Sequence, residues 1–249
     1  MAYFRKYAII TVNFKDRPMK KICDNIAFIR KSIELLNKSA KVELIAVTKT
    51  FPYQDVLQAV ECGVKHIGES RIQEALLKFE RIGAGLDGVM KHFIGHLQSN
   101  KAKKAVENFD LIHSLDSIKL AEEISRHARN AGKTQSCLIE IKVSCEQTKT
   151  GIKPQDAPDF YRRCLKIPNI HIEGLMTIAP LNGDPEDSRP YFKQAYKLFT
   201  GMRKDCAESG FDILSMGMSG DYKIAVEEGA NMVRIGSAIF GDRNYGDGQ

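Results

Sequence analysis

The chain has 249 residues, of which 43% are hydrophobic and 27% charged, and 37 basic against 31 acidic side chains leave a net charge of +6. A chain of this length buries a core without metal or disulfide support, and the composition is that of a globular protein. The basic residues are scattered and not interleaved with aromatic ones, which argues against a nucleic-acid-binding platform.

Two features of the sequence concern its location. The six cysteines lie far apart with no C-x-x-C pair, which indicates neither a zinc site nor a disulfide framework, so we expect reduced thiols in a cytoplasmic protein. Residues 1–18 contain a short apolar patch interrupted by charges and followed by no cleavage site. We therefore expect an N-terminal extension there, rather than a signal peptide or a membrane span.

Helical spacing of apolar residues predicts a first helix from Met19 to Lys38. Eight short apolar segments follow and predict strands at 43–49, 65–70, 91–96, 111–116, 137–144, 170–178, 212–219 and 232–240. Helical patterns lie between them, at 55–63, 72–83, 100–109, 117–132, 157–167, 188–210 and 221–230. Strands alternating with helices predict an α/β fold, a single (β/α)8 TIM-type barrel domain over residues 19–249. A doubly wound open sheet is the alternative, but no G-x-G-x-x-G turn follows the first strand.

The first predicted strand ends in a lysine, Lys49 of the segment LIAVTKT. An ammonium at the tip of a buried strand must be solvated, paired or used in chemistry. Ligand groups of such barrels collect at the carboxyl ends of the strands, so Lys49 is a candidate. The other strand ends also deliver polar or small residues: Ser70, His96, Asp116, Ser144, Thr177, Ser219 and Ser237.

The loops after the last two predicted strands are rich in small residues. They read SMGMSGD at 215–221 and RIGSAIFG at 234–241. Small residues let the backbone approach a ligand closely, and these two loops most often bind phosphate in such barrels. A role confined to tight turns is the alternative for either loop, but the two together predict a phosphate site.

Arg234 interrupts the apolar eighth strand, where alternation places it in the barrel interior or under the helices. Its guanidinium needs an acceptor in either place, so a structural ion pair and a ligand contact both remain open. A lysine and a phosphate cradle at one mouth predict an aldehyde-bearing phosphate held as a Schiff base. Pyridoxal 5′-phosphate (PLP) fits this description, and so does a phosphosugar on an aldolase-type lysine.

Eight motifs in fixed order make the chain resemble the pyridoxal phosphate homeostasis protein family. Between about Leu44 and Gly241 they read AVTKT, HIGESRIQE, KHFIGHLQSNK, HSLDS, TKTGI, EGLMTI, LSMGMSGD and VRIGSAIFG. The resemblance implies a fold-type III PLP-binding barrel like the N-terminal domain of alanine racemase, without that enzyme's second, β-rich domain. It also implies a role in intracellular PLP (vitamin B6) homeostasis.

The same resemblance implies cofactor-binding residues. Lys49 is expected to form the Schiff base with PLP, and Arg234 to face the pyridine nitrogen. The other expected cofactor-binding residues are Ser70, Met176, Met218, Ser219, Gly236 and Ser237. Ser70 and Lys142 stand where the family usually has asparagines, so contacts around the cofactor are expected to differ there.

Two arguments favour a binding protein over an enzyme. An arginine donates to the pyridine nitrogen and keeps it unprotonated, which makes PLP a poor electron sink. Racemisation also needs a second proton carrier, which in alanine racemase comes from the partner subunit's additional domain. We therefore expect no catalytic residues and no dedicated turnover, with a small racemase-like PLP enzyme and a Schiff-base aldolase as alternatives.

The remaining expectations concern partners and polar residues near strand ends. The expected partners are PLP and PLP-dependent apo-enzymes as recipients, without nucleic acid or membrane, and we expect a monomer. His92, His96 and His113 are candidates for acid–base groups or metal ligands, but their spacing specifies no metal site. Glu69 and Asp116 are expected either to pair with basic residues at the mouth or simply to mark the ends of helices.

Overall fold

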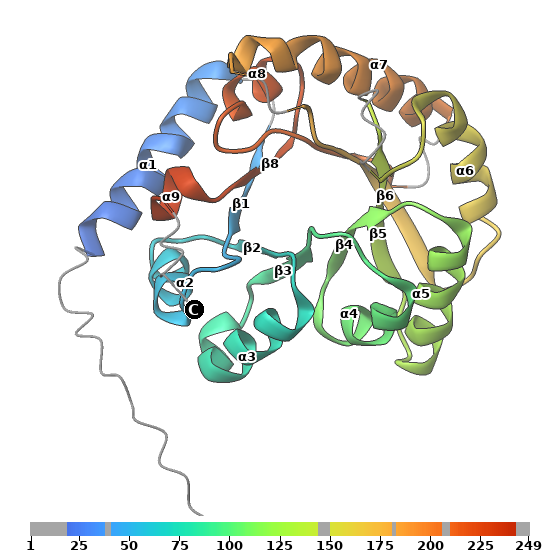
Figure 1. Ribbon diagram of the computed structural model, residues 1–249, viewed down its shortest axis with the longest axis horizontal. Coiled ribbons are helices and arrows are strands. Elements are labelled where there is room, and N and C mark those ends of the chain that lie inside the picture. The colour runs from blue at the N-terminus through green and yellow to red at the C-terminus, as the bar shows by residue number, and fades with distance from the viewer. Residues whose placement is uncertain (1–18, 38–40, 144–149, 181–182, 206–209, 243–249) are drawn as a thin grey trace, which may run out of the picture.

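Eight parallel strands form a closed barrel in the computed structural model, which describes residues 19–37, 41–143, 150–180, 183–205 and 210–242. Neighbours in the chain pair with one another, and β8 pairs with β1 to close the ring (Figure 1). The strands are β1 (Glu43–Val47), β2 (His66–Glu69), β3 (Met90–Phe93), β4 (Leu111–Leu115), β5 (Gln135–Ile141), β6 (Ile170–Thr177), β7 (Ile213–Ser215) and β8 (Met232–Ile235). The predicted barrel is confirmed, and the doubly wound alternative is wrong. The predicted N-terminal extension lies outside the described residues.

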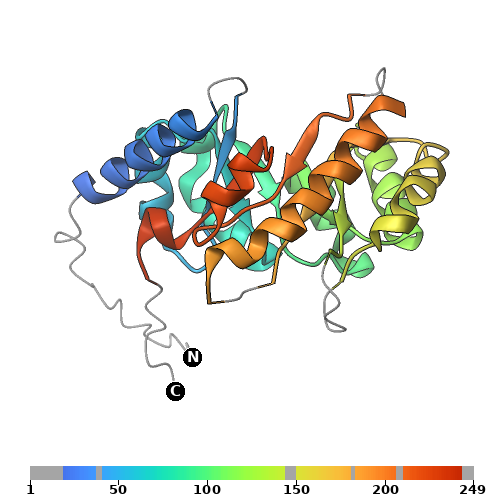
Figure 2. The ribbon, with the colours of Figure 1, turned by 90° about the horizontal axis from the view of Figure 1, so that it is seen from above.

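Helices connect the strands and cover the outside of the barrel, as two views at right angles show (Figures 1 and 2). They are α1 (Met19–Leu36), α2 (Tyr53–Glu61), α3 (Ile72–Ile82), α4 (Ala102–Asn108), α5 (Ile118–Asn130), α6 (Ala157–Cys164), α7 (Arg189–Asp205), α8 (Tyr222–Glu227) and α9 (Ser237–Phe240). Short 3-10 turns lie at η2 (Gly83–Leu86), η3 (Ser99–Lys101), η4 (Pro154–Asp156) and η5 (Pro185–Ser188). In the part of the chain described above, no helix is both long and apolar enough to cross a membrane.

The first helix lies outside the repeating strand–helix units. Its buried face carries Ile22, Ile26, Ile29 and Ile33, spaced three and four residues apart as helical periodicity requires. This face packs against α2, α8 and α9. The helix therefore covers the seam where β8 meets β1.

A disulfide joins α1 to the end of α2, between Cys23 and Cys62, whose Cα atoms lie 5.3 Å apart. The expectation that all cysteines are reduced is therefore wrong for this pair. The reason is spatial, because α1 packs against α2 while the two cysteines are 39 residues apart in the chain. Cys137 and Cys164 are free and buried.

Alternation of side chains separates the barrel interior from the layer beneath the helices. A small interior cluster comprises Ile45, Leu111, Leu138, Met176 and Met232. On β8, Val233 and Ile235 instead belong to the larger core shared with the helices. Arg234 lies two residues after Met232 on β8 and so points to the same side, into the barrel interior. This decides between the interior and the layer under the helices, which the sequence leaves open.

Some predicted strands extend too far. The first strand ends at Val47 rather than at residue 49, because the N–H of Phe51 donates to the carbonyl of Thr48 and closes a turn. The strand predicted at 232–240 ends at Ile235, since the N–H of Phe240 donates to the Gly236 carbonyl and α9 begins. Both corrections fall at the carboxyl ends of strands, where the chain turns back toward the helices.

We call the end of the barrel at these carboxyl ends the mouth, and the opposite end the lower rim. The predicted polar strand ends lie at the mouth, except Ser144, which lies outside the described residues.

Candidate functional site

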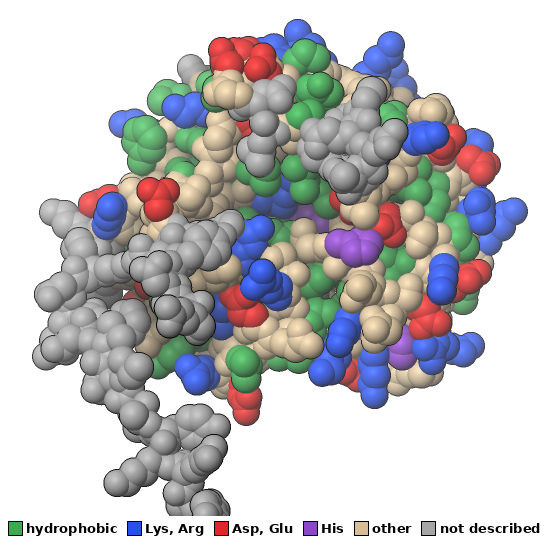
Figure 3. Space-filling model, in the orientation of Figure 1, with side chains coloured by type: hydrophobic (Ala, Val, Ile, Leu, Met, Phe, Trp, Pro, Cys, Tyr) green, Lys and Arg blue, Asp and Glu red, His purple; other side chains and the backbone are tan. Residues whose placement is uncertain are grey.

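The mouth of the barrel contains a cavity of about 500 Å³. Its lining comprises Lys49, Ser70, Ile94, Gly95, His96, Glu140, Ile141, Lys142, Thr150 and Ile178. Figure 3 shows a face of the molecule that is hollowed near its centre, with basic, acidic and histidine side chains gathered around the hollow. Two of the predicted cofactor-binding residues, Lys49 after β1 and Ser70 after β2, therefore line one cavity.

The residues on both sides of Lys49 are held by carboxylates. The Thr48 hydroxyl donates to Glu69 Oε1 at 2.7 Å, and the N–H of Thr50 donates to Glu74. Thr50 has a φ of 69°, a left-handed conformation that is rare for a β-branched residue. The half-buried Lys49 thus lies in a turn whose shape depends on polar groups of β2 and α3.

A buried lysine joins these two carboxylates. The Lys78 ammonium donates to Glu69 Oε1 at 2.7 Å and to the Thr48 carbonyl at 2.6 Å, and it lies 2.7 Å from Glu74 Oε1. Burial raises the pKa of Glu69, although the charge of Lys78 opposes this. Partial burial, the largest single effect, would raise the pKa of Glu74 too, but hydrogen bonds from Lys78 and Thr50 and the nearby positive charges together outweigh it and lower the pKa. We refer to Thr48, Glu69, Glu74 and Lys78 as the Lys78 cluster.

The loops after β7 and β8 are in direct contact. The Ser219 hydroxyl oxygen accepts from the N–H of Gly236 at 3.1 Å and from the N–H of Ala238 at 3.3 Å. Two backbone donors thus converge on one oxygen, the arrangement that a phosphate oxygen also requires. A Cβ added to Gly236 would lie 3.3 Å from the Val47 carbonyl oxygen, so this loop lies beside the end of β1.

Three other predicted cofactor-binding residues do not line the mouth cavity. Met218 donates its N–H to Asp221 Oδ1 at 2.6 Å, so this donor is already used within its own loop. Ser237 is exposed at the start of α9. Met176 is 1% exposed and packs in the interior cluster.

Arg234 spans the interior between β8 and its neighbours. Nη1 donates to the Ser215 hydroxyl at 2.6 Å, and Nη2 donates to the Thr177 carbonyl at 2.9 Å. Burial lowers the pKa of Arg234 to about 10, against the opposing charges of Asp221 and Glu140, so the guanidinium is positive at neutral pH. Because both acceptors are uncharged, these contacts favour the ligand-contact interpretation over a structural ion pair.

Glu140 is a cavity residue that the sequence reading missed. Its Oε2 is buried without a hydrogen-bond partner, while Oε1 accepts from the Thr150 hydroxyl at 3.2 Å. Burial raises the pKa of this carboxyl. The sequence did contain a signal for Glu140. It lies two residues after Leu138 on β5, and strand alternation therefore places both side chains in the barrel interior.

Lys78 was missed as well. It lies on the buried face of α3 together with Ile72, Ala75 and Ile82. A lysine at an apolar-face position must reach a buried acceptor, so the helical spacing contained a signal.

The other polar residues at strand ends have structural partners. His96 Nδ1 lies 3.5 Å from Asp116 Oδ2 at the edge of the mouth, and the Thr177 hydroxyl donates to the Ile141 carbonyl at 2.8 Å. Within the described ranges, no group of three or more His, Cys, Asp or Glu side chains could hold a metal ion.

The residues present fit a small aldehyde with an anionic tail. A lysine amine lines the cavity, a convergent pair of N–H donors lies beside it, and a buried cation lies in the interior below. Glu140 adds a buried polar atom that lacks a partner in the same cavity. The chemistry of this donor set matches the aldehyde, phosphate and ring nitrogen of PLP.

Comparison with known proteins adds independent information. Residues 20–244 match the family model of the alanine racemase N-terminal domain. A pyridoxal phosphate homeostasis protein of Aquifex aeolicus is 40% identical over 218 residues, which cover 87% of this chain and 94% of that protein. PipY of Synechococcus elongatus PCC7942, solved with PLP bound, is 35% identical with a TM-score of 0.79 and covers 88% of this chain and 100% of that one. Alanine racemase of Clostridium difficile 630 shares the fold at 19% identity and a TM-score of 0.67, over 90% of this chain and 57% of that one.

Proposed function

This chain belongs to the family of pyridoxal phosphate homeostasis proteins, and from that premise we propose that it binds PLP at the barrel mouth and serves PLP homeostasis. The observation that carries the proposal is the position of Lys49. It lines the mouth cavity with Ser70, and the strand before it lies beside the loop in which Ser219 accepts from Gly236. The PLP-bound relative supports the same ligand.

In this proposal Lys49 holds PLP as a Schiff base through its amine. Ser219, Gly236 and Ser237 bind the phosphate, with Met218 as a backbone neighbour in the same loop. Arg234 donates toward the ring nitrogen. Ser70 and Met176 complete the expected contacts, and residues 19–249 form one PLP-binding domain.

We also propose that the protein has no dedicated turnover. PLP is a much weaker electron sink for a bound amino acid when its ring nitrogen is unprotonated. Arg234 has a pKa of about 10 and therefore remains a donor at neutral pH, which keeps the ring nitrogen an acceptor. The residues around the mouth thus favour binding of the cofactor over catalysis with it.

Covalent capture at Lys49 can be tested directly. The purified protein, incubated with PLP, reduced with borohydride and digested, is expected to carry the added mass on the peptide that contains Lys49. The Lys49→Ala variant should lose this mass and the accompanying visible absorbance. Lys142→Ala is the matched control, because Lys142 lines the same cavity and the proposal gives it no covalent role.

Two outcomes would contradict the proposal. One is equal PLP capture by wild type and Lys49→Ala, and the other is mass on Lys142 instead. Incubation with L- or D-alanine separately tests the absence of turnover, since sustained racemisation would favour the enzyme alternative. Recipient apo-enzymes, a monomeric state and a cytoplasmic location stay predictions.

A further inference from the structure

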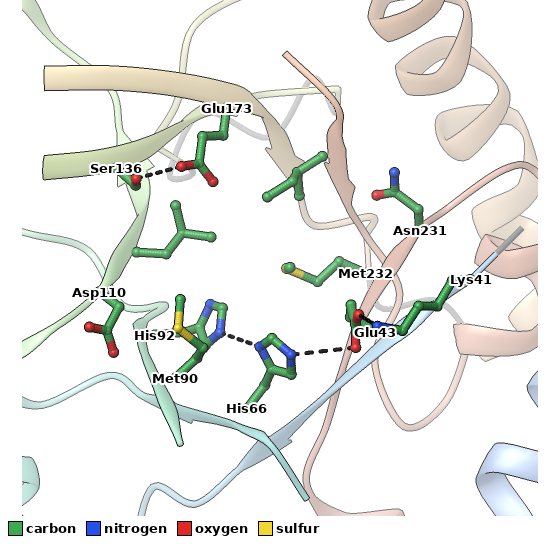
Figure 4. Close-up of a pocket in the computed structure, with 12 residues that line it drawn as sticks. Lys41, Glu43, His66, Met90, His92, Asp110, Ser136, Glu173, Asn231 and Met232 are labelled. Atoms are coloured by element: carbon green, nitrogen blue, oxygen red, sulfur yellow. Dashed lines mark hydrogen bonds and ion pairs between the residues drawn. The ribbon is translucent and has the colours of Figure 1, made fainter. Parts of the chain in front are cut away.

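Three histidines form a continuous hydrogen-bonded column inside the barrel. His66 Nδ1 lies 2.9 Å from His92 Nε2, and His92 Nδ1 lies 3.0 Å from His113 Nε2. At the lower rim, His66 Nε2 lies 3.4 Å from Glu43 Oε2. Dashed lines in Figure 4 follow the first part of this column, from Glu43 through His66 to His92.

The column rises from the lower rim toward the mouth. His66 is in register with Met90, and His92 follows two residues further along β3. His92 is in turn in register with Leu111, and His113 follows two residues further along β4. Each step therefore moves one interior position upward, across three neighbouring strands.

The two ends of the column have different surroundings. His66 and His92 line a cavity of about 290 Å³ at the lower rim, together with Glu43 and Asp110. His113 is 0% exposed, and its Nδ1 is buried with no hydrogen-bond partner. The lower end thus lies at a pocket, whereas the upper end presents a buried nitrogen.

Charges at the two ends give the column a direction. A neutral imidazole has one N–H and one lone pair, and the Glu43 carboxylate only accepts. His66 Nε2, the ring nitrogen nearest the Glu43 carboxylate, therefore carries the N–H, and each histidine above donates from Nε2 to Nδ1 of the one below. His113 Nδ1 is then a lone pair, which the nearby positive charge of Arg234 favours over an N–H.

Each histidine faces a defined set of charged groups. His66 faces Glu43, Lys41 and Lys65 as well as His92, and burial lowers its pKa despite the opposing charge of Glu43. Asp110 and Glu173 line the same lower pocket.

The upper histidines are more deeply buried. Burial lowers the pKa of His92 to about 3, with His66 adding to the effect. Burial, followed by His92, Arg234 and His66, lowers the pKa of His113 well below its usual value. At neutral pH both rings are uncharged, so they can pass a proton along without storing a charge.

We propose that His66, His92 and His113 form a proton relay between the lower-rim pocket and the barrel interior beside Arg234. A ligand or a water molecule in the barrel interior gives up a proton, breaking its own N–H or O–H bond, and His113 Nδ1 accepts it. This releases the proton on His113 Nε2 to His92 Nδ1. His92 Nε2 then gives its proton to His66 Nδ1, and His66 Nε2 gives its own to Glu43 or to water in the pocket. Three bonds to hydrogen break inside the column and three form, so one proton crosses with no change in total charge on the histidines.

The relay would give the ligand side of the barrel a second route for proton exchange, remote from the mouth. Only the identity of that ligand, PLP, rests on the proposed function. The column itself can be tested without any cofactor.

The first test determines the tautomers in the protein without added PLP. Nitrogen-15 NMR of the imidazole rings at neutral pH should show protonated Nε2 and unprotonated Nδ1 for His66, His92 and His113. A protonated Nδ1 on His113 would overturn the direction of the column and with it the proposed route.

The second test measures transfer. Exchange of the His113 Nε2 proton with deuterated water should slow by about tenfold or more in His66→Gln. An amide forms hydrogen bonds but, unlike an imidazole, does not take up a proton on one nitrogen while it releases one from another. His171→Gln is the matched control, since His171 is an exposed histidine on β6 outside the column. Backbone amide exchange in β4 should be the same in wild type and both variants, which separates the effect from local unfolding. Equal His113 exchange in wild type and His66→Gln would overturn the relay.

The third test links the relay to the ligand. After a rapid pH jump, the spectral change of bound PLP should be several times slower in His66→Gln than in wild type or His171→Gln. Equal rates would show that the column does not serve the ligand. If PLP fails to bind at all, the proposed function fails, while the first two tests still decide whether the relay exists.

Discussion

The two ends of the barrel differ in how their carboxylates are paired. At the lower rim Glu43 pairs with Lys41 and Glu173 accepts from the Ser136 hydroxyl, so the buried oxygen without a partner there, Gln135 Oε1, is uncharged. At the mouth, Glu140 has a buried oxygen without a partner. Paired groups need no ligand, whereas an unpaired buried group has a desolvation cost that a ligand can offset. The comparison indicates which end is arranged for binding and which for stability.

The mouth also contains a unit built around a buried cation, the Lys78 cluster, in which Glu69 Oε1 is paired and Glu69 Oε2 is not. Breaking this cluster should have the largest effect. Lys78→Met would leave the Glu69 carboxylate, 1% exposed, without its cation. We expect a loss of about 3–5 kcal/mol in the free energy of unfolding, as for other broken buried pairs. Urea unfolding followed by circular dichroism measures it.

The double variant Glu69→Gln with Lys78→Met is the control for this prediction. It removes both buried charges, so it should recover at least half of the loss. A loss in Lys78→Met well under about 1 kcal/mol, the range of exposed pairs, would contradict the assignment of a coupled buried cluster.

Acid should have the next largest effect, through the buried histidines of the column. His92 and His113 have pKa values lowered by burial, so the unfolded chain binds protons that the folded chain does not. Their contribution is present above the ordinary histidine pKa and is lost as the pH falls below it. Between pH 7 and pH 5 we expect unfolding free energy to fall by about 4 kcal/mol for two such groups.

Urea unfolding at several pH values checks this slope. His92→Phe removes one of the two titrating rings and should make the slope shallower. His171→Gln, an exposed histidine, should leave it unchanged. Equal stability of wild type at pH 5 and pH 7 would count against buried neutral imidazoles.

The disulfide next to the lower rim should have a smaller effect. Cys62 lies shortly before β2, and its bond to Cys23 closes a segment of 39 residues. Chain-entropy estimates for loops of this size give about 2–4 kcal/mol. Unfolding of the wild type with and without dithiothreitol measures the difference, and Cys23→Ser should show no further response to the reductant. A wild type insensitive to reduction would contradict the bond.

The smallest expected change tests close packing at the mouth. A Cβ on Gly95 would lie 2.4 Å from the Ser70 carbonyl oxygen, so Gly95→Ala must displace backbone. We expect a loss of about 1–3 kcal/mol, typical of overpacking, and weaker PLP binding in a fluorescence titration. Gly201→Ala is the matched control, since Gly201 is exposed on α7, outside the mouth, and nothing lies within 4 Å of its added Cβ. Equal behaviour of the two variants would show that the Gly95 contact does not matter.

Much of the fold could be predicted from the sequence, because strand and helix periodicities are local. The carboxyl end of each strand could be located to within a few residues, which was enough to single out Lys49. Where the first strand stops was not predictable, because the turn at Thr50 depends on a carboxylate from α3.

Contacts between elements were harder to predict. Cys23 and Cys62 approach because α1 packs on α2, which no local pattern states. The histidine column depends on the register of three neighbouring strands, and strand alternation alone does not supply register. Strand alternation left two places for the Arg234 side chain, the barrel interior and the layer under the helices. Only the closed barrel shows that it lies in the interior.

The pairing of β8 with β1 has a consequence for how the ligand-free protein meets other chains. A sheet that ends in free strands offers unpaired amides and carbonyls to other chains, and such borders template aggregation. Each of the eight strands here is flanked on both sides, so the sheet is closed by its own strands and needs no ligand to protect its borders. The ligand-free form of the barrel therefore presents no strand edge on which another chain could pair.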